Sequence, residues 1–196
     1  MLKGKASLLS VLSMTTLLLI PLLIAAPAAA YLPIYPGPSY DPATGSGFSE
    51  GDFNYNPGFC INDSGTVAGM CCQYVNNNCL SWRAVRWDAS GSAPVEMENL
   101  FPDDAYTQSQ PVAMNAAGTV VGFSHKFING VDLGQVPARW DGTRITELSI
   151  PALYPGTATG QAYSINDAGY IVGSVIWKSG NTIQGKAALR WDPSGP

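Results

Sequence analysis

Few residues of this chain could act chemically on a bound molecule. The segment GFSEG, from Gly47 to Gly51, matches the G-x-S-x-G pattern that presents a serine nucleophile, here Ser49. The single histidine, His125, is the one imidazole that could act as its base, and its surroundings predict an exposed loop. The pattern needs a buried strand before the serine and a helix after it, whereas loop-forming residues flank this one. The sequence therefore favours a protein without a catalytic site.

The four cysteines lie close together, at Cys60, Cys71, Cys72 and Cys79. Four thiolates could bind one zinc ion, but the spacing lacks the paired C-x2-C arrangement of zinc sites. An even number of cysteines in an exported chain favours two disulfides. Cys72 and Cys79 flank the turn-like VNNN, so we expect a cross-strand bond there, with Cys60–Cys71 as its complement and other connectivities open. We expect no metal and no cofactor.

The N-terminus predicts export. Lys3 and Lys5 precede an apolar stretch rich in leucine, and three alanines end at Ala30, so residues 1–30 have the pattern of a cleaved signal peptide. Residues 31–57 are rich in Pro, Gly and Tyr and predict an irregular arm. Without the two signal lysines, eight of the ten basic residues remain against fourteen acidic ones. This balance argues against nucleic acid and anionic membranes as partners, and no later segment could span a bilayer.

The elements that would position any site are repeated three times. The segments Ile61–Gly69, Met114–Gly122 and Ile165–Gly173 share one pattern, apolar-Asn-x-x-Gly followed by β-branched residues and a second Gly. An Arg-Trp-Asp element follows, and its Trp comes after the Asn at the same interval in every copy. The repeat residues are Asn62, Gly65, Gly69, Arg86 and Trp87; Asn115, Gly118, Gly122, Arg139 and Trp140; Asn166, Gly169, Gly173, Arg190 and Trp191.

The first element predicts a β-hairpin with a three-residue loop. Its Gly suits the left-handed position of such a loop, and the Asn side chain can accept from the backbone two residues on. The second Gly lies in the following strand, where it suits a bulge or a close backbone approach. A calcium loop would need several carboxylates, yet Ala116 stands where the other copies have Asp63 and Asp167. These segments are therefore interpreted as turns.

The second element predicts a strand that ends in a buried Trp. Alternation places Trp87 with Val85 on one face and Arg86 with Ala84 on the other, and the same holds in the other copies. The repeated Arg has two interpretations. It could tie neighbouring repeats together through backbone carbonyls or the Asp that follows each Trp, or it could form a ring around an anionic ligand; the fixed spacing to Trp favours the first.

Each full repeat thus predicts four short antiparallel strands, with repeats at about 58–108, 109–159 and 160–196. The pattern apolar-Asn-x-x-Gly-x-Val-Val-Gly followed by Arg-Trp resembles the HAF-type extracellular repeats of bacterial secreted proteins, over Phe59 to Pro196. The second element departs from that family, since Arg-Trp replaces its usual His-Ala-Phe ending. The resemblance implies an extracellular location and a β-propeller-like build, and it brings no catalytic residues.

The sequence therefore predicts an all-β fold of tandem four-stranded antiparallel repeats. We expect an incomplete, propeller-like arrangement because the third copy stops after its Trp; a β-trefoil is the alternative. An open sheet edge would favour self-association.

For function, we expect a non-catalytic module, secreted to the medium or the periplasm, that binds an extracellular protein or polysaccharide. The aromatic residues outside the repeat pattern are candidates for its contact face, namely Tyr74, Trp82, Tyr154 and Trp177. The alternatives are a secreted hydrolase of extracellular polymers and a truncated product without a function of its own.

Overall fold

A computed structural model describes residues 43–44, 46–50, 60–90, 95–101, 106–129, 131–154 and 157–193, with only the backbone of Gly47–Glu50. The chain divides into two units, Met1–Leu32 and Pro33–Pro196, and every described residue belongs to the second. The predicted signal peptide and most of the predicted arm therefore lie outside the described residues.

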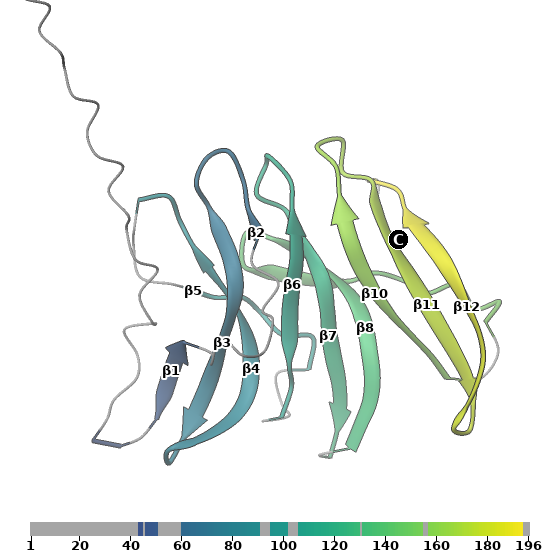
Figure 1. Ribbon diagram of the computed structural model, residues 1–196, viewed down its shortest axis with the longest axis horizontal. Helices are drawn as coiled ribbons and strands as arrows, with labels where there is room; N and C mark the ends of the chain where they lie inside the picture. Colours follow the sequence, from purple (N-terminus) through teal and green to yellow (C-terminus); the bar gives the residue numbers. More distant parts are fainter. Residues whose placement is uncertain are drawn as a thin grey trace, which may run out of the picture. The chain divides into compact units, whose positions relative to one another are not determined.

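The described residues form β-strands and no helix, which confirms the all-β prediction. They make three antiparallel sheets (Figure 1). The first contains β1 (Gly47–Glu50), β2 (Cys60–Ile61), β3 (Val67–Val75), β4 (Asn78–Trp87) and β5 (Val95–Glu96). The second contains β6 (Ser109–Met114), β7 (Val120–Ile128), β8 (Val131–Asp141) and β9 (Arg144–Glu147). The third contains β10 (Thr157–Ile165), β11 (Ile171–Ser179) and β12 (Thr182–Trp191).

Each sheet corresponds to one sequence repeat. The second has the predicted four strands in the order β6-β7-β8-β9, and the third has three in the order β10-β11-β12. In the first sheet the outer strand comes in two pieces, because β1 and β2 both pair with β3. The β1 strand lies within the segment predicted as an irregular arm. Its local sequence does not indicate that it pairs with β3.

Every sheet is built around one long hairpin, β3–β4, β7–β8 or β11–β12. The repeat turns lie at one end of the sheets, at the top of Figure 1, and the tips of the long hairpins lie at the other. At the first tip, Asn76 and Asn77 have positive φ angles of 50° and 63°. Two such residues give a type I′ turn, whose twist matches that of the flanking strands.

The sheets pack face to face through small and aromatic side chains. Ala68 and Ala84 of the first sheet form one core cluster with Val120, Ala138 and Trp140 of the second. The residues at these sequence positions define two faces. We call the face that carries Val67, Val85 and Trp87, or their counterparts, the front face, and the face that carries Ala68 and Ala84 the back face.

The second junction follows the same rule. Val121, on the back face of the second sheet, packs with Ile171 and Trp191 on the front face of the third. Strand β10 lies against β7 and β8 across this junction. The stacking is therefore directional, with the back face of one sheet covered by the front face of the next.

Candidate functional site

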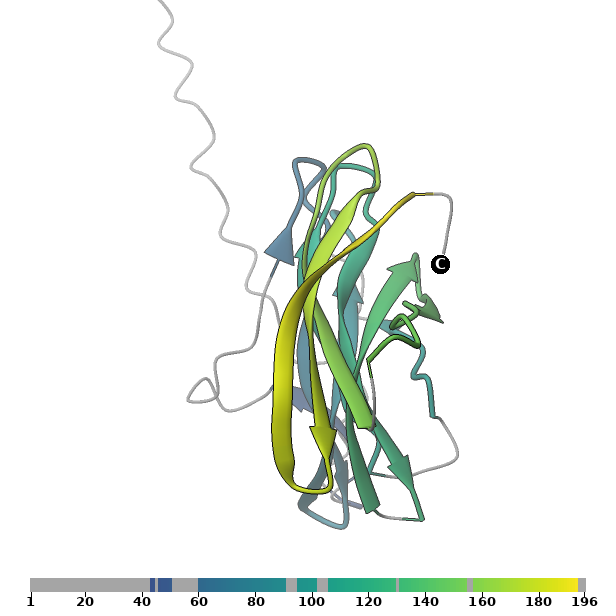
Figure 2. The ribbon, with the colours of Figure 1, turned by 90° about the vertical axis from the view of Figure 1, so that its right-hand side faces the viewer.

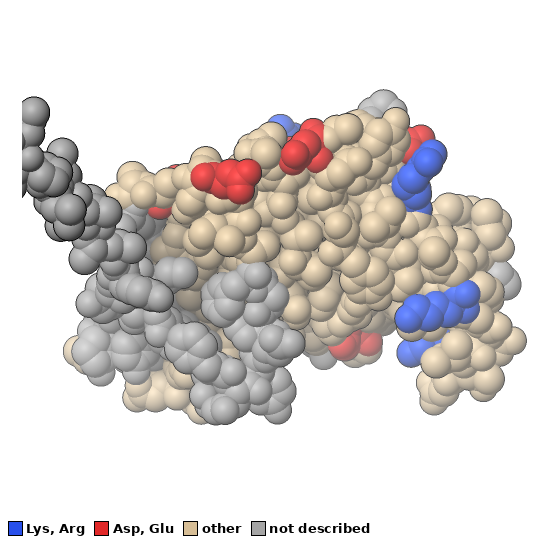
Figure 3. All heavy atoms as spheres, turned by 45° about the horizontal axis from the view of Figure 1, so that its top comes forward, with Lys and Arg blue, Asp and Glu red and all other residues tan. Residues whose placement is uncertain are grey.

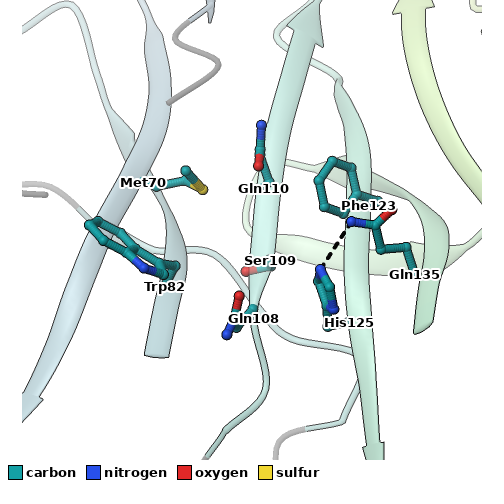
Figure 4. Close-up of a pocket in the computed structure, with 8 residues that line it drawn as sticks. All are labelled: Met70, Trp82, Gln108, Ser109, Gln110, Phe123, His125 and Gln135. Carbon is teal, nitrogen blue, oxygen red and sulfur yellow. Dashed lines mark hydrogen bonds between the residues drawn. The ribbon is translucent and has the colours of Figure 1, made fainter. Parts of the chain in front are cut away.

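A groove of about 450 Å3 lies between the first two sheets (Figure 4). Met70 of β3 and Trp82 of β4 line one side, and Phe123, His125 and Gln135 of β7 and β8 line the other. Between them run Gln108, Ser109 and Gln110 at the start of β6.

Strand alternation places these side chains in the groove. Phe123 and His125 point to one face of β7, while Ser124 between them is buried. Gln135 lies directly opposite His125 in the β7–β8 register, so its amide reaches the imidazole. The position of the groove therefore depends on the register of the second hairpin.

The polar side of the groove is a hydrogen-bonded chain. The Gln135 amide nitrogen lies 3.1 Å from His125 Nε2, and His125 Nδ1 lies 3.1 Å from an Asp132 carboxylate oxygen. Because an amide nitrogen only donates, Nε2 accepts and Nδ1 carries the proton that is donated to Asp132. The Gln135 carbonyl accepts from the amide of Gln161. This chain orients the imidazole ring and the Gln135 side chain.

The apolar side offers flat surfaces. The His125 ring lies 5.9 Å from Phe123 and 6.1 Å from Phe127, centroid to centroid. Trp82 lies across the groove from Phe123 and His125 (Figure 4). The described residues that line the groove include no carboxylate and no lysine or arginine. The groove can therefore stack against a flat ligand and hydrogen-bond to it without a formal charge.

The predicted nucleophile Ser49 is not placed in an elbow. It belongs to β1, where it lies opposite Cys72 in an antiparallel pair, and no helix follows it among the described residues. His125 lies in strand β7 rather than in the predicted loop, because β6 and β8 pair on both sides of it. Its Nε2 is bonded to Gln135 rather than to a hydroxyl group.

The three repeat turns have one geometry. In each, the backbone N–H of the left-handed Gly donates to the carbonyl of the Asn three residues earlier, at 2.9 Å. The glycines are Gly65, Gly118 and Gly169, with φ angles of 81°, 83° and 86°. The Asn side-chain oxygen accepts from the backbone four residues on, at 2.9–3.0 Å, rather than two residues on as expected. The longer reach closes the whole loop.

The same asparagines also bond from one repeat to the next. The Asn62 amide donates to the Ala116 carbonyl at 3.3 Å, and the Asn115 amide donates to the Asn166 carbonyl at 3.2 Å. One carboxylate takes part, since the backbone N–H of Ala116 donates to Asp167 at 2.9 Å. A shallow groove of about 320 Å3 runs along this row of turns. The turns thus form a ladder that sets the spacing of the sheets.

The Arg-Trp elements add a second set of bonds between repeats. Trp140 Nε1 donates to the Glu98 carbonyl at 2.9 Å, and Trp191 Nε1 donates to the Ser149 carbonyl at 2.7 Å. Trp87 Nε1 is buried and has no acceptor among the described residues.

The arginines bond close to these tryptophans. Arg86 donates to Asp88 and also to the Gly118 carbonyl of the next repeat, at 2.9 and 3.0 Å. Arg139 makes two bonds to Asp141, and Arg190 lies 3.2 Å from Asp192. Each guanidinium is thus engaged by its own repeat, and the three do not converge on a common anion site.

The strand glycines mark close backbone approaches. A Cβ added at Gly122 would overlap the Gln110 carbonyl, and one at Gly173 would overlap the Gln161 carbonyl. A register shift follows in the facing strand in both places. Gly69 occupies the same position in β3, opposite Val85.

Of the two expected disulfides, one is present. Cys72 and Cys79 are bonded across the β3–β4 hairpin, with their Cα atoms 5.8 Å apart. The expected Cys60–Cys71 bond is not formed. The Cys60 thiol donates to the Ala68 carbonyl, and burial raises its pKa to about 11, which keeps the thiol protonated. Local turn chemistry thus identified the bonded pair, whereas elimination gave the wrong complement.

The aromatic candidates separate in the structure. Trp82 lines the groove, whereas Tyr154 of the second repeat and Trp177 of the third form a ring contact of 4.7 Å. Tyr74 lies in β3 opposite Gly47. Sequence reasoning missed the glutamines of the groove, Gln108, Gln110 and Gln135, because they lie outside the repeated Asn-x-x-Gly and Arg-Trp elements.

The described part of the chain has neither a metal-binding cluster nor a membrane-spanning helix. It contains no group of three or more His, Cys, Asp or Glu side chains placed to hold a metal ion. Nor does any helix in it have the length and apolar character needed to cross a membrane.

Fold and site together define an all-β repeat protein with a neutral groove between its first two sheets. Residues 46–186 match the model of a family described as protein of unknown function (DUF3466), and the chain belongs to this family. Comparison with curated proteins and with solved structures gave no match.

Proposed function

We propose that this protein is a secreted, non-catalytic module that binds a neutral extracellular polysaccharide in the groove between its first two sheets. The observation that supports this proposal is the lining of the groove, in which Trp82 and Phe123 face a row of glutamine amides. Sugar rings have apolar C–H faces that stack on aromatic side chains. Their hydroxyl groups pair with amides, which both donate and accept hydrogen bonds.

A protein ligand is the second kind of partner that the sequence suggests, and the groove favours it less. Protein interfaces are rich in aromatic residues and arginine over a large area, whereas this groove has a small, uncharged lining. A neutral glycan also fits the acidic balance of the chain, which disfavours nucleic acid.

Several further features support export and the wider architecture of the proposal. The N-terminal signal pattern and the Cys72–Cys79 disulfide both suit an oxidising compartment outside the cytoplasm. The directional stacking of three sheets suits a propeller-like arrangement of HAF-type repeats better than a trefoil, because each repeat forms a sheet of its own.

Isothermal titration of the exported protein with neutral oligosaccharides tests the binding. We expect Trp82→Ala to abolish binding and Trp82→Phe to retain part of it, because Phe keeps a stacking surface. Leu153→Ala, at an exposed position of the loop after β9, is the matched control and should bind normally. Unchanged binding by Trp82→Ala would overturn the proposal.

The hydrolase alternative is tested in the same samples. We expect no shortened oligosaccharide after prolonged incubation, and no difference between the native protein and Ser49→Ala. Products that disappear in Ser49→Ala would show that the protein is an enzyme instead.

A further inference from the structure

One position in the long hairpins holds a different residue in each repeat. Trp82, Gln135 and Lys186 lie at the same distance before the Trp of their own repeats, and each pairs with the corresponding residue of the preceding strand. The three long hairpins run in the same direction, one behind another (Figure 2). These three residues therefore lie at the same distance from the hairpin tips in all three sheets, and they can be compared directly.

At the second junction, between the second and third sheets, this position joins the two sheets. The side-chain amide of Gln161 in β10 donates to the side-chain carbonyl of Gln135. Close by, a Cβ added at Gly134 would overlap the Thr159 methyl group, so the two sheets are in direct contact here. A carboxamide carbonyl is thus the group that the β10 glutamine binds.

At the first junction, between the first and second sheets, the matching glutamine lacks such a partner. Gln110 of β6 has the repeat position of Gln161, but the residue across the junction is Trp82 instead of a glutamine. An indole ring has an N–H donor and no carbonyl. The Gln110 amide makes no hydrogen bond within the described part of the chain, and it is half-buried in the groove (Figure 4). The groove therefore holds an unpaired amide beside a flat aromatic surface.

The group that pairs with this amide must also suit an uncharged site. In the third repeat the position of Trp82 is taken by Lys186, and Figure 3 shows most of the visible lysine and arginine at the end formed by the third sheet. At the first junction the described lining residues carry no carboxylate, ammonium or guanidinium group. A neutral acceptor is therefore the best match for Gln110.

We propose that the groove takes a polysaccharide whose sugars carry acetamido groups, an inference that rests on the glycan binding proposed above. The acetamido carbonyl accepts from the Gln110 amide, as the Gln135 carbonyl accepts from Gln161 at the second junction. The acetamido methyl group packs on Met70, a flexible apolar side chain that lies across the groove from Gln110 (Figure 4). The sugar ring stacks on Trp82.

A sugar with a hydroxyl group in place of the acetamido group fits the same surface less well. The hydroxyl oxygen can accept a hydrogen bond from Gln110, but it brings no methyl group to Met70. It also lies closer to the sugar ring than an acetamido carbonyl does, so it reaches less far toward the amide. One better hydrogen bond and one buried methyl group together correspond to about tenfold in affinity.

Isothermal titration with two matched oligosaccharides of four sugars tests this inference. One consists of β-1,4-linked N-acetylglucosamine and the other of β-1,4-linked glucose, so they differ only in the group at carbon 2. We expect the exported protein to bind the acetylated oligosaccharide about tenfold more tightly. In Gln110→Ala the two affinities should lie within about twofold of each other, because the acetamido carbonyl loses its donor. Gln184→Ala, at an exposed glutamine of the third hairpin, is the matched control and should keep the full preference.

The possible failures can be told apart. Equal affinity of the native protein for the two oligosaccharides contradicts the acetamido preference and leaves glycan binding standing. A preference that survives in Gln110→Ala contradicts the role of Gln110 in the same way. If the native protein binds neither oligosaccharide, the proposed function and this inference fail together.

Trp82→Gln tests the equivalence of the two junctions without a ligand. This variant places a carboxamide across from Gln110, as Gln135 lies across from Gln161. We expect Trp82→Gln to melt at a higher temperature than Trp82→Ala, and we expect this difference to shrink when Gln110→Ala is added to both. A difference that is the same with and without Gln110→Ala would show that the two amides do not meet, which contradicts the inference.

Discussion

The two ends of each repeat follow different rules. At the turn end, all three copies use the same left-handed Gly and the same Asn, whose side-chain oxygen accepts at 2.9–3.0 Å in every copy. At the tip end, one pair of matching positions carries different residues in each of the three copies. The first copy has the Cys72–Cys79 disulfide and the second has the hydrogen-bonded His125–Asp132 pair, while the third has Ile176 and Ile183 at these sequence positions.

The difference lies in how far the bonds reach. The turn residues bond across the junction, so a change in one repeat would also disturb its neighbour. The tip residues bond only within their own hairpin, where any pair that joins two strands suffices. The asparagine whose side chain bonds across the junction is thus the same in every copy.

Among the variants considered, Gly122→Ala should lower the free energy of unfolding most, because Gly122 lies against backbone near the turn end of its strand. The new Cβ would overlap the Gln110 carbonyl, so the facing strand must move. We expect the free energy of unfolding to fall by about 3 kcal/mol in chemical denaturation followed by circular dichroism. The control is Gly142→Ala, where φ is +66° but the added atom meets open space; it should cost about 1 kcal/mol.

The ladder between turns is tested by Asn115→Ala compared with Asn166→Ala. Both variants lose the bond that closes their own turn, but only Asn115→Ala also loses a bond to the next repeat. In dilute protein we expect losses of about 2 kcal/mol for Asn115→Ala and about 1 kcal/mol for Asn166→Ala. Equal losses would mean that the bond between repeats contributes nothing.

At the tip end, the double variant Cys72→Ser, Cys79→Ser removes the disulfide of the first hairpin. The bond closes a short loop, since the two residues are seven apart, and its loss should cost about 2 kcal/mol. Thermal melts of the double variant and of the reduced protein should agree. A melting temperature equal to that of the oxidised protein would show that the disulfide does not stabilise the hairpin.

A disulfide introduced at the second hairpin tip tests whether the first and second tips have the same geometry. His125→Cys with Asp132→Cys places two thiols at the positions that match Cys72 and Cys79. We expect thiol titration to show a new disulfide, with a gain of about 1 kcal/mol because engineered bonds give less than native ones. Two unreacted thiols would mean that the second tip has a different geometry.

The smallest expected effect is the contribution of Cys60, near the first turn, to the pH dependence of stability. Its pKa is about 11 in the folded protein, against 9.0 for an ordinary thiol. Between these values the unfolded chain releases the proton and the folded chain keeps it, so stability falls as pH rises. We expect a steeper fall from pH 9 to 11 in the native protein than in Cys60→Ser, measured by urea denaturation. Parallel curves would contradict the raised pKa.

The sequence predicts the turns and the buried tryptophans because their chemistry is local. An Asn followed three residues later by Gly closes the same loop in all three copies, and alternation alone places the side chains of Trp140 and Arg139 on opposite faces of their strand. The Cys72–Cys79 bond was predictable for the same reason, since the turn between the two residues brings them together.

The groove was not predictable, because its residues meet only through pairing between distant strands. His125 gives no local sign that Gln135 will lie opposite it, and Met70 reaches the groove from another repeat. Strand β1 is a similar case, since its pairing with β3 spans the segment from Glu50 to Cys71. Such contacts depend on the whole stack.

The fixed distance from turn to tryptophan has a consequence for how such chains change length. The interval from Asn to Trp is the same in every copy, yet the connection from Trp87 to Asn115 is longer than the one from Trp140 to Asn166. All variation in repeat length therefore falls in the connection after the Trp. Insertions there would leave the spacing of the turns unchanged, so evolution, or a protein engineer, can add new sequence at that point without rebuilding the stack.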